Sequence, residues 1–540
     1  MKSRKKYSNT IVLKRSKPIP HSSRGIVYLV GAGPGDPGLI TVKGLQALKQ
    51  ADVVIYDHLV SERLLDHCRP AANIIYAGKE KSRHTKSQAE IERLLIRFAK
   101  AGKRVVRLKG GDPFLFGRGG EEAEALSKAR VAYDVVPGVS SAIAVPAYAG
   151  IPVTHRAVAS SVAMVTGHED PLKTDTNLNW PQLATATDTL VLLMGVGTLR
   201  VTVEQLIRHG RAKTAPCAVI EWGTLPRQRT VAGTLSTIVR QCQGARVRPP
   251  AVIVVGEVVR LRKSLKWFER KPLFGQRIVV TRPTDRVDQL ANLLEAFGAE
   301  VIALPAIQLA PVESNGLFRR ALHEIDTFDS VFFTSPEGIQ WFKRLLAKER
   351  KDLRILQGCH IAAIGPKTAA SIEQQGVHVD YQPSTFSQEG LLAGLRHRRL
   401  DGKQALILSA KGARDVLEQG LQASGMSVVK VPIYQSVMPR QFVQQVRRVF
   451  ARPPDWVTVT SSSCVDHLVA ALRAARFARL IPTIQWASIG PVTSRTVRQH
   501  GGRVAIEART ATIEGLVDAM VKRGGHRGVS RAAAAKASAI

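Results

Sequence analysis

Short apolar runs rich in β-branched residues alternate with segments of helical periodicity along nearly the whole chain. Such alternation favours an α/β fold, because strands buried on both faces need helices packed against them. The first half opens with an apolar run at 26–31, a glycine-rich loop and a helical segment near 41–50. Further strands are expected in this half near 52–57, 72–76, 104–108, 161–166, 189–194, 216–220 and 251–256.

A second series of the same kind begins at Arg277-Ile-Val-Val-Thr-Arg282 and contains an internal echo. Ala363-Ile-Gly-Pro-Lys-Thr368 resembles Ser488-Ile-Gly-Pro-Val-Thr493, and Thr334-Ser335 resembles Thr460-Ser461. Each of these motifs follows a strand candidate. We therefore expect two similar α/β lobes, each with a Gly-Pro turn that leads from a strand into a helix.

The 540 residues carry a formal net charge of +35, which favours anionic partners. Nucleic acid and a polycarboxylate substrate are two candidates, and a basic surface retained for solubility is the alternative. The sequence contains no helix-turn-helix, zinc-finger or RNA-recognition signature, so we expect no nucleic-acid partner. Segments 1–24 and 523–540 are basic, contain no acid and are expected to form disordered tails.

The five cysteines are scattered, and no two have metal-ligand spacing. We therefore expect no metal site and no disulfide framework, which fits a reducing cytoplasm. The stretch 135–154 has the length of a membrane span and no charge, but Pro137, Pro146 and Pro152 interrupt it. We interpret this stretch as loop, short helix and loop, and we expect no contact with a membrane.

The loop Gly31-Ala-Gly-Pro-Gly-Asp-Pro-Gly38 lies between a strand and a helix. It contains a Gly-x-Gly-x-x-Gly match, and Asp57 ends a strand 19 residues later, so a nicotinamide-dependent enzyme is one interpretation. However, Pro34 and Pro37 stiffen the loop and delay the helix, whereas a dinucleotide site needs the helix to begin within the glycine run.

A longer string decides between these interpretations: Arg107-Leu-Lys-Gly-Gly-Asp-Pro-Phe-Leu-Phe-Gly-Arg-Gly-Gly-Glu-Glu122. Its glycines let a ligand approach the backbone closely, and Asp112 can accept hydrogen bonds from a ligand. With this string and several other motifs, residues 25–262 resemble the uroporphyrinogen-III C-methyltransferases of the tetrapyrrole methylase family. The other motifs are 31–38, Val136-Pro-Gly-Val-Ser-Ser-Ala142, Ala149-Gly-Ile-Pro-Val-Thr-His-Arg156, Val165-Thr-Gly-His168, Leu193-Met-Gly195, Glu221-Trp-Gly-Thr224 and Pro250-Ala-Val-Ile-Val-Val-Gly-Glu257.

This resemblance implies a two-lobed α/β methylase that is homodimeric and binds S-adenosylmethionine between its lobes. By position, Asp57 matches the proposed proton acceptor of the family, and Lys79 matches the proposed proton donor. Arg118 is expected to bind substrate carboxylates, with Arg107, Lys109 and Arg156 as further candidates. The alternative for each is an ordinary solvated charge. The matching cofactor-binding residues are Pro34, Gly110, Gly111, Asp112, Leu115, Ser140, Ser141, Met194 and Gly223.

The second half, residues 275–522, resembles the uroporphyrinogen-III synthases. Each motif is short, and the resemblance depends on their occurrence in order. The motifs are Thr334-Ser-Pro-Glu-Gly338, Ile364-Gly-Pro-Lys-Thr-Ala369, Val431-Pro-Ile-Tyr434, Trp456-Val-Thr-Val-Thr-Ser-Ser-Ser463, Ser488-Ile-Gly-Pro-Val-Thr493 and Thr512-Ile-Glu-Gly-Leu516.

This second resemblance implies a bilobal α/β synthase, with lobes of residues 275–308 plus 434–522 and 309–433, and with substrate between them. Tyr434 matches a tyrosine proposed to assist loss of water, and the alternative is a packed tyrosine at the lobe junction. Hydroxyls and free amides at helix starts suit carboxylates, although the same hydroxyls serve as helix caps. The hydroxyl candidates for substrate binding are Thr334, Ser335, Thr368, Ser461, Ser462 and Thr493.

Together the two halves predict a bifunctional enzyme, joined by a linker at 263–274. It would cyclise hydroxymethylbilane to uroporphyrinogen III and methylate it twice, at C2 and C7, to precorrin-2. One alternative is a related methylase with another acceptor, which the full string at 107–122 disfavours. Another alternative is a methyltransferase whose second half is an inactive, anion-binding module.

Overall fold

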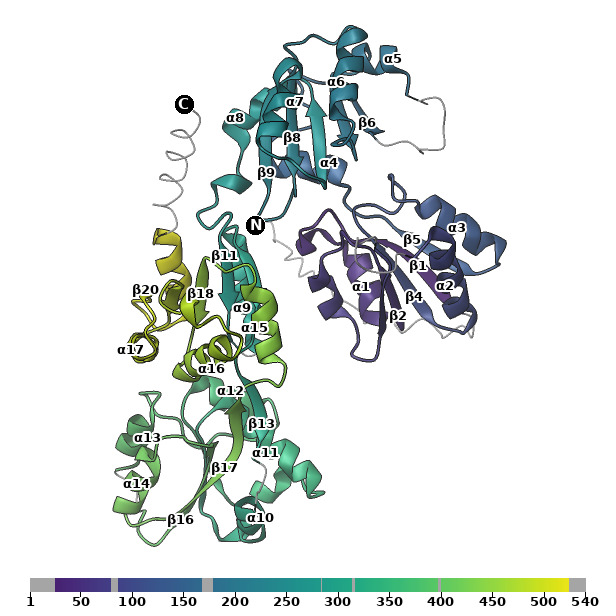
Figure 1. The fold of residues 1–540 in the computed structure, drawn as a ribbon. Coiled ribbons are helices and arrows are strands. Elements are labelled where there is room, and N and C mark those ends of the chain that lie inside the picture. The colour runs from purple at the N-terminus through teal and green to yellow at the C-terminus, as the bar shows by residue number, and fades with distance from the viewer. Residues whose placement is uncertain are drawn as a thin grey trace, which may run out of the picture. The chain divides into compact units, whose positions relative to one another are not determined.

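The computed structural model describes residues 25–78, 86–167, 178–282, 284–312, 316–396 and 400–523. The chain divides into two compact units, Met1–Gly275 and Gln276–Ile540. Each unit contains two five-stranded sheets, and Figure 1 shows helices packed along the strands of both units. The predicted α/β fold class, a two-lobed first half followed by a bilobal second half, is confirmed.

The first sheet is entirely parallel, with strand order β3-β2-β4-β1-β5. Its strands are apolar on both faces because helices cover both: Val27 and Leu29 pack with α2 and α3, and Val30 packs with α1. All five carboxyl ends lie at one edge, where ligands bind in open α/β sheets. The elements are β1 Ile26–Gly31, α1 Val42–Gln50, β2 Val53–Tyr56, β3 Asn73–Tyr76, α2 Gln88–Lys100, β4 Arg104–Lys109, α3 Gly119–Lys128 and β5 Ala132–Val136.

The second sheet is mixed, with strand order β6-β7-β10-β8-β9. Helix α4 follows β5 and packs against β7 and β10, so it joins the two lobes of this unit. The uncharged stretch 135–154 is therefore a strand end, a loop, a short helix and a loop. The elements are α4 Ser141–Tyr148, β6 Val162–Thr166, α5 Trp180–Thr185, β7 Thr189–Leu193, α6 Leu199–Arg208, β8 Pro216–Glu221, β9 Arg229–Thr234, α7 Leu235–Gly244 and β10 Ala251–Val255.

Residues 263–274, which the sequence suggests as a linker, are instead folded onto the first unit. They include part of α8, Arg262–Leu265, and a short 3-10 helix, Phe268–Arg270. Phe268 is buried and its ring lies 4.9 Å from that of Tyr148, and Trp267 Nε1 donates to the carbonyl of Ala147. This aromatic cluster explains why the segment does not run free between the units.

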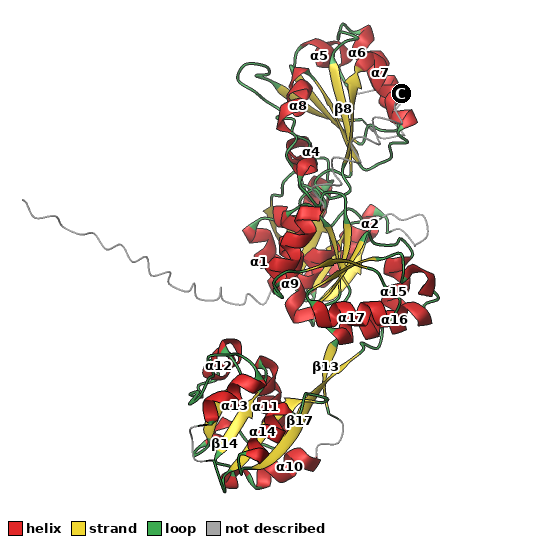
Figure 2. Ribbon diagram, turned by 90° about the vertical axis from the view of Figure 1, so that its left-hand side faces the viewer, coloured by secondary structure: helices red, strands yellow, loops and turns green. Residues whose placement is uncertain are grey.

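The second unit has one fully parallel sheet, β12-β11-β18-β19-β20. Helices α15, α16 and α17 lie side by side along it, as Figure 2 shows. The other sheet, β13-β17-β16-β14-β15, is parallel except for β13. The chain passes between the two sheets twice, before β13 and after β17. A final helix covers 513–523.

The elements of the first of these sheets are β11 Arg277–Val280, α9 Thr284–Ala296, β12 Glu300–Ala303, α15 Phe442–Phe450, β18 Trp456–Val459, α16 Ser462–Ala474, β19 Gln485–Ser488, α17 Pro491–Gln499 and β20 Val504–Glu507. Those of the second are β13 Gln308–Pro311, α10 Gly316–His323, β14 Ser330–Phe333, α11 Pro336–Lys348, β15 His360–Ala363, α12 Pro366–Glu373, α13 Gln388–Leu395, β16 Gln404–Ala410, α14 Val416–Ala423 and β17 Ser427–Val437.

The sequence echo corresponds to a repeated local structure, as predicted. Ser335 and Ser461 are both N-caps that follow a strand, with φ of −163° and −160°. Gly365 and Gly490 are N-caps in extended conformation, each followed by a proline in the first turn of the helix. The two lobes of the second unit therefore present equivalent strand-to-helix turns at the carboxyl ends of their sheets.

Among the described residues, no helix is both long enough and apolar enough to cross a bilayer.

Candidate active sites

Three loops meet at the carboxyl edge of the first sheet, after β1, β4 and β5. Gly33 and Gly111 exchange backbone hydrogen bonds of 3.2 and 2.7 Å. A Cβ on Gly138 would lie 2.3 Å from the carbonyl oxygen of Gly111 and 2.6 Å from Cα of Gly31. These glycines therefore let the loops pack on one another, a role that the sequence did not distinguish from close approach of a ligand.

Asp112 holds two of these loops together. Its Oδ1 accepts hydrogen bonds from the backbone N–H groups of Phe114 (2.8 Å) and Leu115 (3.0 Å). Its Oδ2 accepts from the backbone N–H of Gly138 at 2.9 Å. The carboxylate, which the sequence predicts to bind a ligand, organises the loop after β4 and fixes it to the loop after β5.

The start of α4 adds small polar groups to this edge. Ser140 is the N-cap, and its Oγ accepts from the backbone N–H of Ala142 at 3.2 Å. Ser141 is the first residue of the helix. Leu115 packs against the apolar core of the second lobe, so the predicted cofactor residues near β4 and β5 lie where the lobes join.

The second lobe contributes the loops after β7 and β8. The backbone N–H of Asp36 donates to Thr224 Oγ1 at 3.2 Å, and the Tyr148 hydroxyl donates to Asp36 Oδ2 at 2.8 Å. A Cβ on Gly223 would lie 2.3 Å from the side chain of Val145. The loop that contains Pro34 therefore contacts the loop that contains Gly223. Burial and the nearby Asp36 carboxylate raise the pKa of Tyr148.

Left-handed backbone conformations mark the same loops. Of the non-glycine residues with positive φ in the described chain, Arg130, Arg246, Arg350 and Arg476 follow helix C-caps, where this conformation is common. The others all lie in the loops after β4, β7 and β8: Phe116, Arg118, Met194, Trp222 and Thr224. Strain that is concentrated in this way is typical of ligand-binding sites, and only Arg118 and Met194 of these five were predicted from the sequence.

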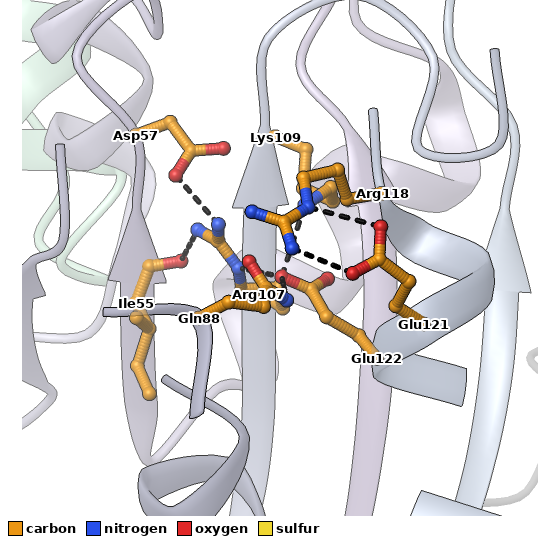
Figure 3. A network of polar contacts seen from close by, with 8 residues as sticks. All are labelled: Ile55, Asp57, Gln88, Arg107, Lys109, Arg118, Glu121 and Glu122. Carbon is orange, nitrogen blue, oxygen red and sulfur yellow. Dashed lines mark hydrogen bonds and ion pairs between the residues drawn. The ribbon is translucent and has the colours of Figure 1, made fainter. Parts of the chain in front are cut away.

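A buried charged network lies beside this edge (Figure 3). Arg107 Nη2 is 2.6 Å from Asp57 Oδ1, and Arg107 Nε is 2.9 Å from Glu122 Oε1. Lys109 Nζ is 3.0 Å from the same Glu122 oxygen. Arg107 and Lys109, considered from the sequence as substrate anchors, are therefore buried and already paired, and that expectation is wrong.

The pKa values of the two cations in this network are shifted in opposite directions. Burial lowers the pKa of Arg107, but the charges of Asp57 and Glu122 outweigh this effect and raise it overall. Burial and the charge of Arg107 lower the pKa of Lys109. Arg107 is therefore the fixed positive charge beside Asp57.

The remaining predicted residues of the first unit differ in how the structure places them. Arg118 forms a bidentate ion pair with Glu121, at 2.9 and 2.6 Å, on an exposed surface. Gly110 directly follows β4, and a Cβ there would contact Leu59 at 3.2 Å. Lys79 lies outside the described residues.

In the second unit, the structure brings Tyr434 and Ser335 together. The Tyr434 hydroxyl lies 2.9 Å from Ser335 Oγ, and the side chain is buried among core residues of the 308–437 lobe. Ser335 also caps α11 by accepting from the N–H of Gly338 at 3.2 Å. Thr334 Oγ1 is 3.4 Å from the carbonyl of Leu408.

The other predicted hydroxyls are largely engaged within the protein. Ser461 caps α16 by accepting from the N–H of Cys464, and Ser462 Oγ lies 2.8 Å from Thr496 Oγ1. Thr368 and Thr493 are buried in the first turns of α12 and α17. The hydroxyls of Ser335 and Ser461 are therefore used as helix caps. A substrate carboxylate at these positions would instead contact free backbone N–H groups at the starts of α11 and α16.

A groove of about 670 Å³ lies between the lobes of this unit. Its walls come from the two crossing segments and from α11, α12 and α15. Arg344 lies over the ring of Trp341, with 5.0 Å between guanidinium carbon and ring centroid. The resemblance implied substrate between these lobes, but no predicted site residue lines the groove. It is lined by Pro305, Ile307, Leu309, Trp341, Arg344 and Gln445, among others.

Comparisons with known proteins cover both units. Residues 26–239 match the family of tetrapyrrole (corrin/porphyrin) methylases, and residues 288–518 match the uroporphyrinogen-III synthase HemD family. The porphyrin biosynthesis protein HemD of Ruminiclostridium josui is 35% identical over 93% of this chain and 98% of that protein. The uroporphyrinogen-III C-methyltransferase of Bacillus subtilis is 45% identical over 69% of this chain and 76% of that protein.

A third relative matches the first unit. The S-adenosyl-L-methionine-dependent uroporphyrinogen III methyltransferase of Methanosarcina barkeri is 51% identical over 45% of this chain and 94% of that protein. The order of the two matched regions is that of the two units. The chain is therefore an enzyme of tetrapyrrole biosynthesis that belongs to the tetrapyrrole methylases through its first unit and to the uroporphyrinogen-III synthases through its second.

Proposed function

We propose that this chain cyclises hydroxymethylbilane to uroporphyrinogen III and methylates that product at C2 and C7 to give precorrin-2. We assign methylation to residues 25–262 with the folded segment 263–274, and cyclisation to 275–522. One observation supports the assignment of methylation to the first unit. The loops that Asp112 holds together and the carboxylate of Asp57 lie at the same edge of one sheet.

The first unit suits S-adenosyl-L-methionine, which supplies an electrophilic methyl group when bound. The loops around Asp112 and the start of α4 offer polar groups, and Leu115 and Met194 offer apolar surface. The strained backbone at Met194 and beside Gly223 supports a bound ligand there. We assign the contacts to the matching positions: Pro34, Gly110, Gly111, Asp112, Leu115, Ser140, Ser141, Met194 and Gly223.

Asp57 is the base that we assign to methyl transfer. Transfer of the methyl group to a pyrrole β-carbon of the substrate would break its bond to sulfur and release S-adenosylhomocysteine, and the macrocycle would then have to lose a proton. Asp57 directly follows β2 at this edge, its side chain is 30% exposed, and Arg107 holds it in place. Lys79 is the proposed acid, and Arg118 the proposed contact for substrate carboxylates.

A product assay tests the proposal. Purified protein would receive hydroxymethylbilane and S-adenosyl-L-methionine, and the mass and isomer of the product would be determined. We expect a dimethylated type-III product. Methylation only when preformed uroporphyrinogen III is supplied would favour the alternative, a methyltransferase with an inactive anion-binding second unit.

Tyr434→Phe is expected to slow cyclisation about a hundredfold, the lower end of the usual range for a positioned acid. The hydroxyl is the only group removed, and Ser335 keeps its capping bond to Gly338. Methyl transfer to supplied uroporphyrinogen III should not change. Tyr381→Phe in the same lobe is the control. An unchanged cyclisation rate in Tyr434→Phe would show that Tyr434 serves packing alone.

We also propose that the protein is a homodimer through its first unit and acts in the cytoplasm on small tetrapyrroles, without nucleic acid or membrane. Light scattering should then give twice the 58.8 kDa mass of one chain. Retention on DNA that persists at high salt would contradict the absence of a nucleic-acid partner, because non-specific binding weakens steeply with salt.

A further inference from the structure

Glu122 is a fully buried carboxylate in the first turn of α3. Its Oε1 receives Arg107 Nε at 2.9 Å and Lys109 Nζ at 3.0 Å, and Gln88 Nε2 lies 3.4 Å away. Its Oε2 has no hydrogen-bond partner in the described part of the chain. A buried carboxylate with one oxygen unused is costly, so its retention calls for a role beyond packing.

The alternation of strand β4 places Arg107 and Lys109 on the same face, towards α3. Both side chains are almost fully buried, at 3% and 4% exposure. Two cations in such a place need a counter-charge within the core, because an unpaired buried charge is strongly destabilising. Glu122 supplies that charge to both.

Arg107 connects Glu122 to the edge of the site. One side of its guanidinium meets Glu122 through Nε, and Nη2 meets Asp57 at 2.6 Å. Nη1 also lies 3.4 Å from the carbonyl of Ile55. The planar fork is therefore fixed at both ends (Figure 3), and the carboxylate of Asp57 takes its orientation from it.

We propose that Glu122 is a positioning residue for methyl transfer, which acts through Arg107 to fix the orientation of Asp57 and the charge around it. This inference rests on the proposed function of the first unit. Glu122 itself is sealed from the site, whereas Asp57 is partly exposed at the sheet edge. The negative charge of Glu122 offsets part of the positive field that Arg107 and Lys109 exert on Asp57.

Other charged or titratable groups near this network are already engaged with one another. On α3, Glu121 pairs with Arg118, and the charge of Glu92 on α2 also raises the pKa of Arg118. Beside Asp57, His58 Nδ1 lies 3.1 Å from the hydroxyl of Tyr76. Among the described residues, the groups that set the charge at Asp57 are therefore Arg107, Lys109 and Glu122.

Two substitutions should shift the pH dependence of methyl transfer in opposite directions. Glu122→Gln removes a negative charge, so the ionised form of Asp57 is favoured and the acid limb of the kcat/KM profile moves to lower pH. Lys109→Met removes a positive charge, so the limb moves to higher pH. Each shift should be about half to one pH unit. A weaker, less oriented base should also lower kcat of Glu122→Gln about tenfold, with KM for S-adenosyl-L-methionine within about twofold.

The matched control is Glu124→Gln, on the same helix but with a side chain 74% exposed, and its profile should not move. If Glu122→Gln does not fold, the double variant Glu122→Gln/Lys109→Met, which removes one charge of each sign, replaces it. Its profile should then lie between wild type and Lys109→Met.

The outcomes separate the two proposals. If wild-type protein does not methylate uroporphyrinogen III, the proposed function is wrong. If it does, and if Lys109→Met and the Glu122 variant keep the wild-type profile, the role of Glu122 is structural and the inference is overturned. Shifts of the two single variants in the same direction would overturn it too, because a charge effect on Asp57 requires opposite signs. For the double variant, a shift as large as that of Lys109→Met would overturn it, because the loss of Glu122 would then have had no effect.

Discussion

Asp112→Ala is expected to lower methyl transfer roughly a thousandfold and to leave cyclisation within about twofold of wild type. The substitution removes the acceptor of three backbone N–H groups, those of Phe114, Leu115 and Gly138. Hydrogen bonds to a charged group contribute about 1.5–3 kcal/mol each and are not additive, so a loss of about 4 kcal/mol is reasonable. Such a loss corresponds to roughly a thousandfold in binding of the methyl donor.

The loss should appear first as weaker binding of S-adenosylhomocysteine in calorimetry, because the loops after β4 and β5 would no longer be fixed to each other. Asp112→Asn keeps one carbonyl acceptor and should have an intermediate effect. Asp134→Ala, which removes an exposed ion pair with Lys43 in the same lobe, is the control and should bind normally. A parallel loss of cyclisation in Asp112→Ala would show that the two units do not work independently.

The fold was predictable because it depends on local patterns. Alternating apolar runs gave the strands of both units, and the repeated Gly-Pro and Thr-Ser turns gave the two similar lobes of the second. Strands β9 and β13 lack a strong apolar run and were missed. The segment 263–274 was interpreted as a linker because its composition is basic. Trp267 and Phe268 in it pack against Ala147 and Tyr148, which are distant in sequence, so the sequence pattern does not reveal this contact.

The candidate site was predictable only in part, because the partners of charged residues are set by tertiary structure. In the sequence, Arg107 and Lys109 stand in a glycine-rich string and resemble anchors for an anionic substrate. In the structure, α3 folds back along β4 and brings Glu122 onto both. A motif identifies residues that matter, but it does not distinguish a side chain that faces the ligand from one that holds another residue in place.

The same distinction applies to the glycines, and it leads to a prediction about stability. Gly138→Ala is expected to destabilise the first lobe by about 3 kcal/mol or more, at the upper end of the cost of overpacking. The added Cβ would lie 2.3 Å from the carbonyl oxygen of Gly111 and 2.6 Å from Cα of Gly31. Both neighbours are backbone atoms in the core of the loop assembly, so neither can rotate away.

Hydrogen exchange of the full-length protein measures this effect locally, because peptides from β1 and β4 report the opening of this lobe. Gly120→Ala is a matched control: nothing lies within 4 Å of its Cβ position, and alanine should stabilise α3 by up to about 1 kcal/mol. Opposite effects at two glycines of neighbouring motifs would show that Gly138 is required for loop packing. If Gly138→Ala kept normal exchange in β1 and β4 but lost binding of S-adenosylhomocysteine, the glycine would instead be required for the approach of the ligand.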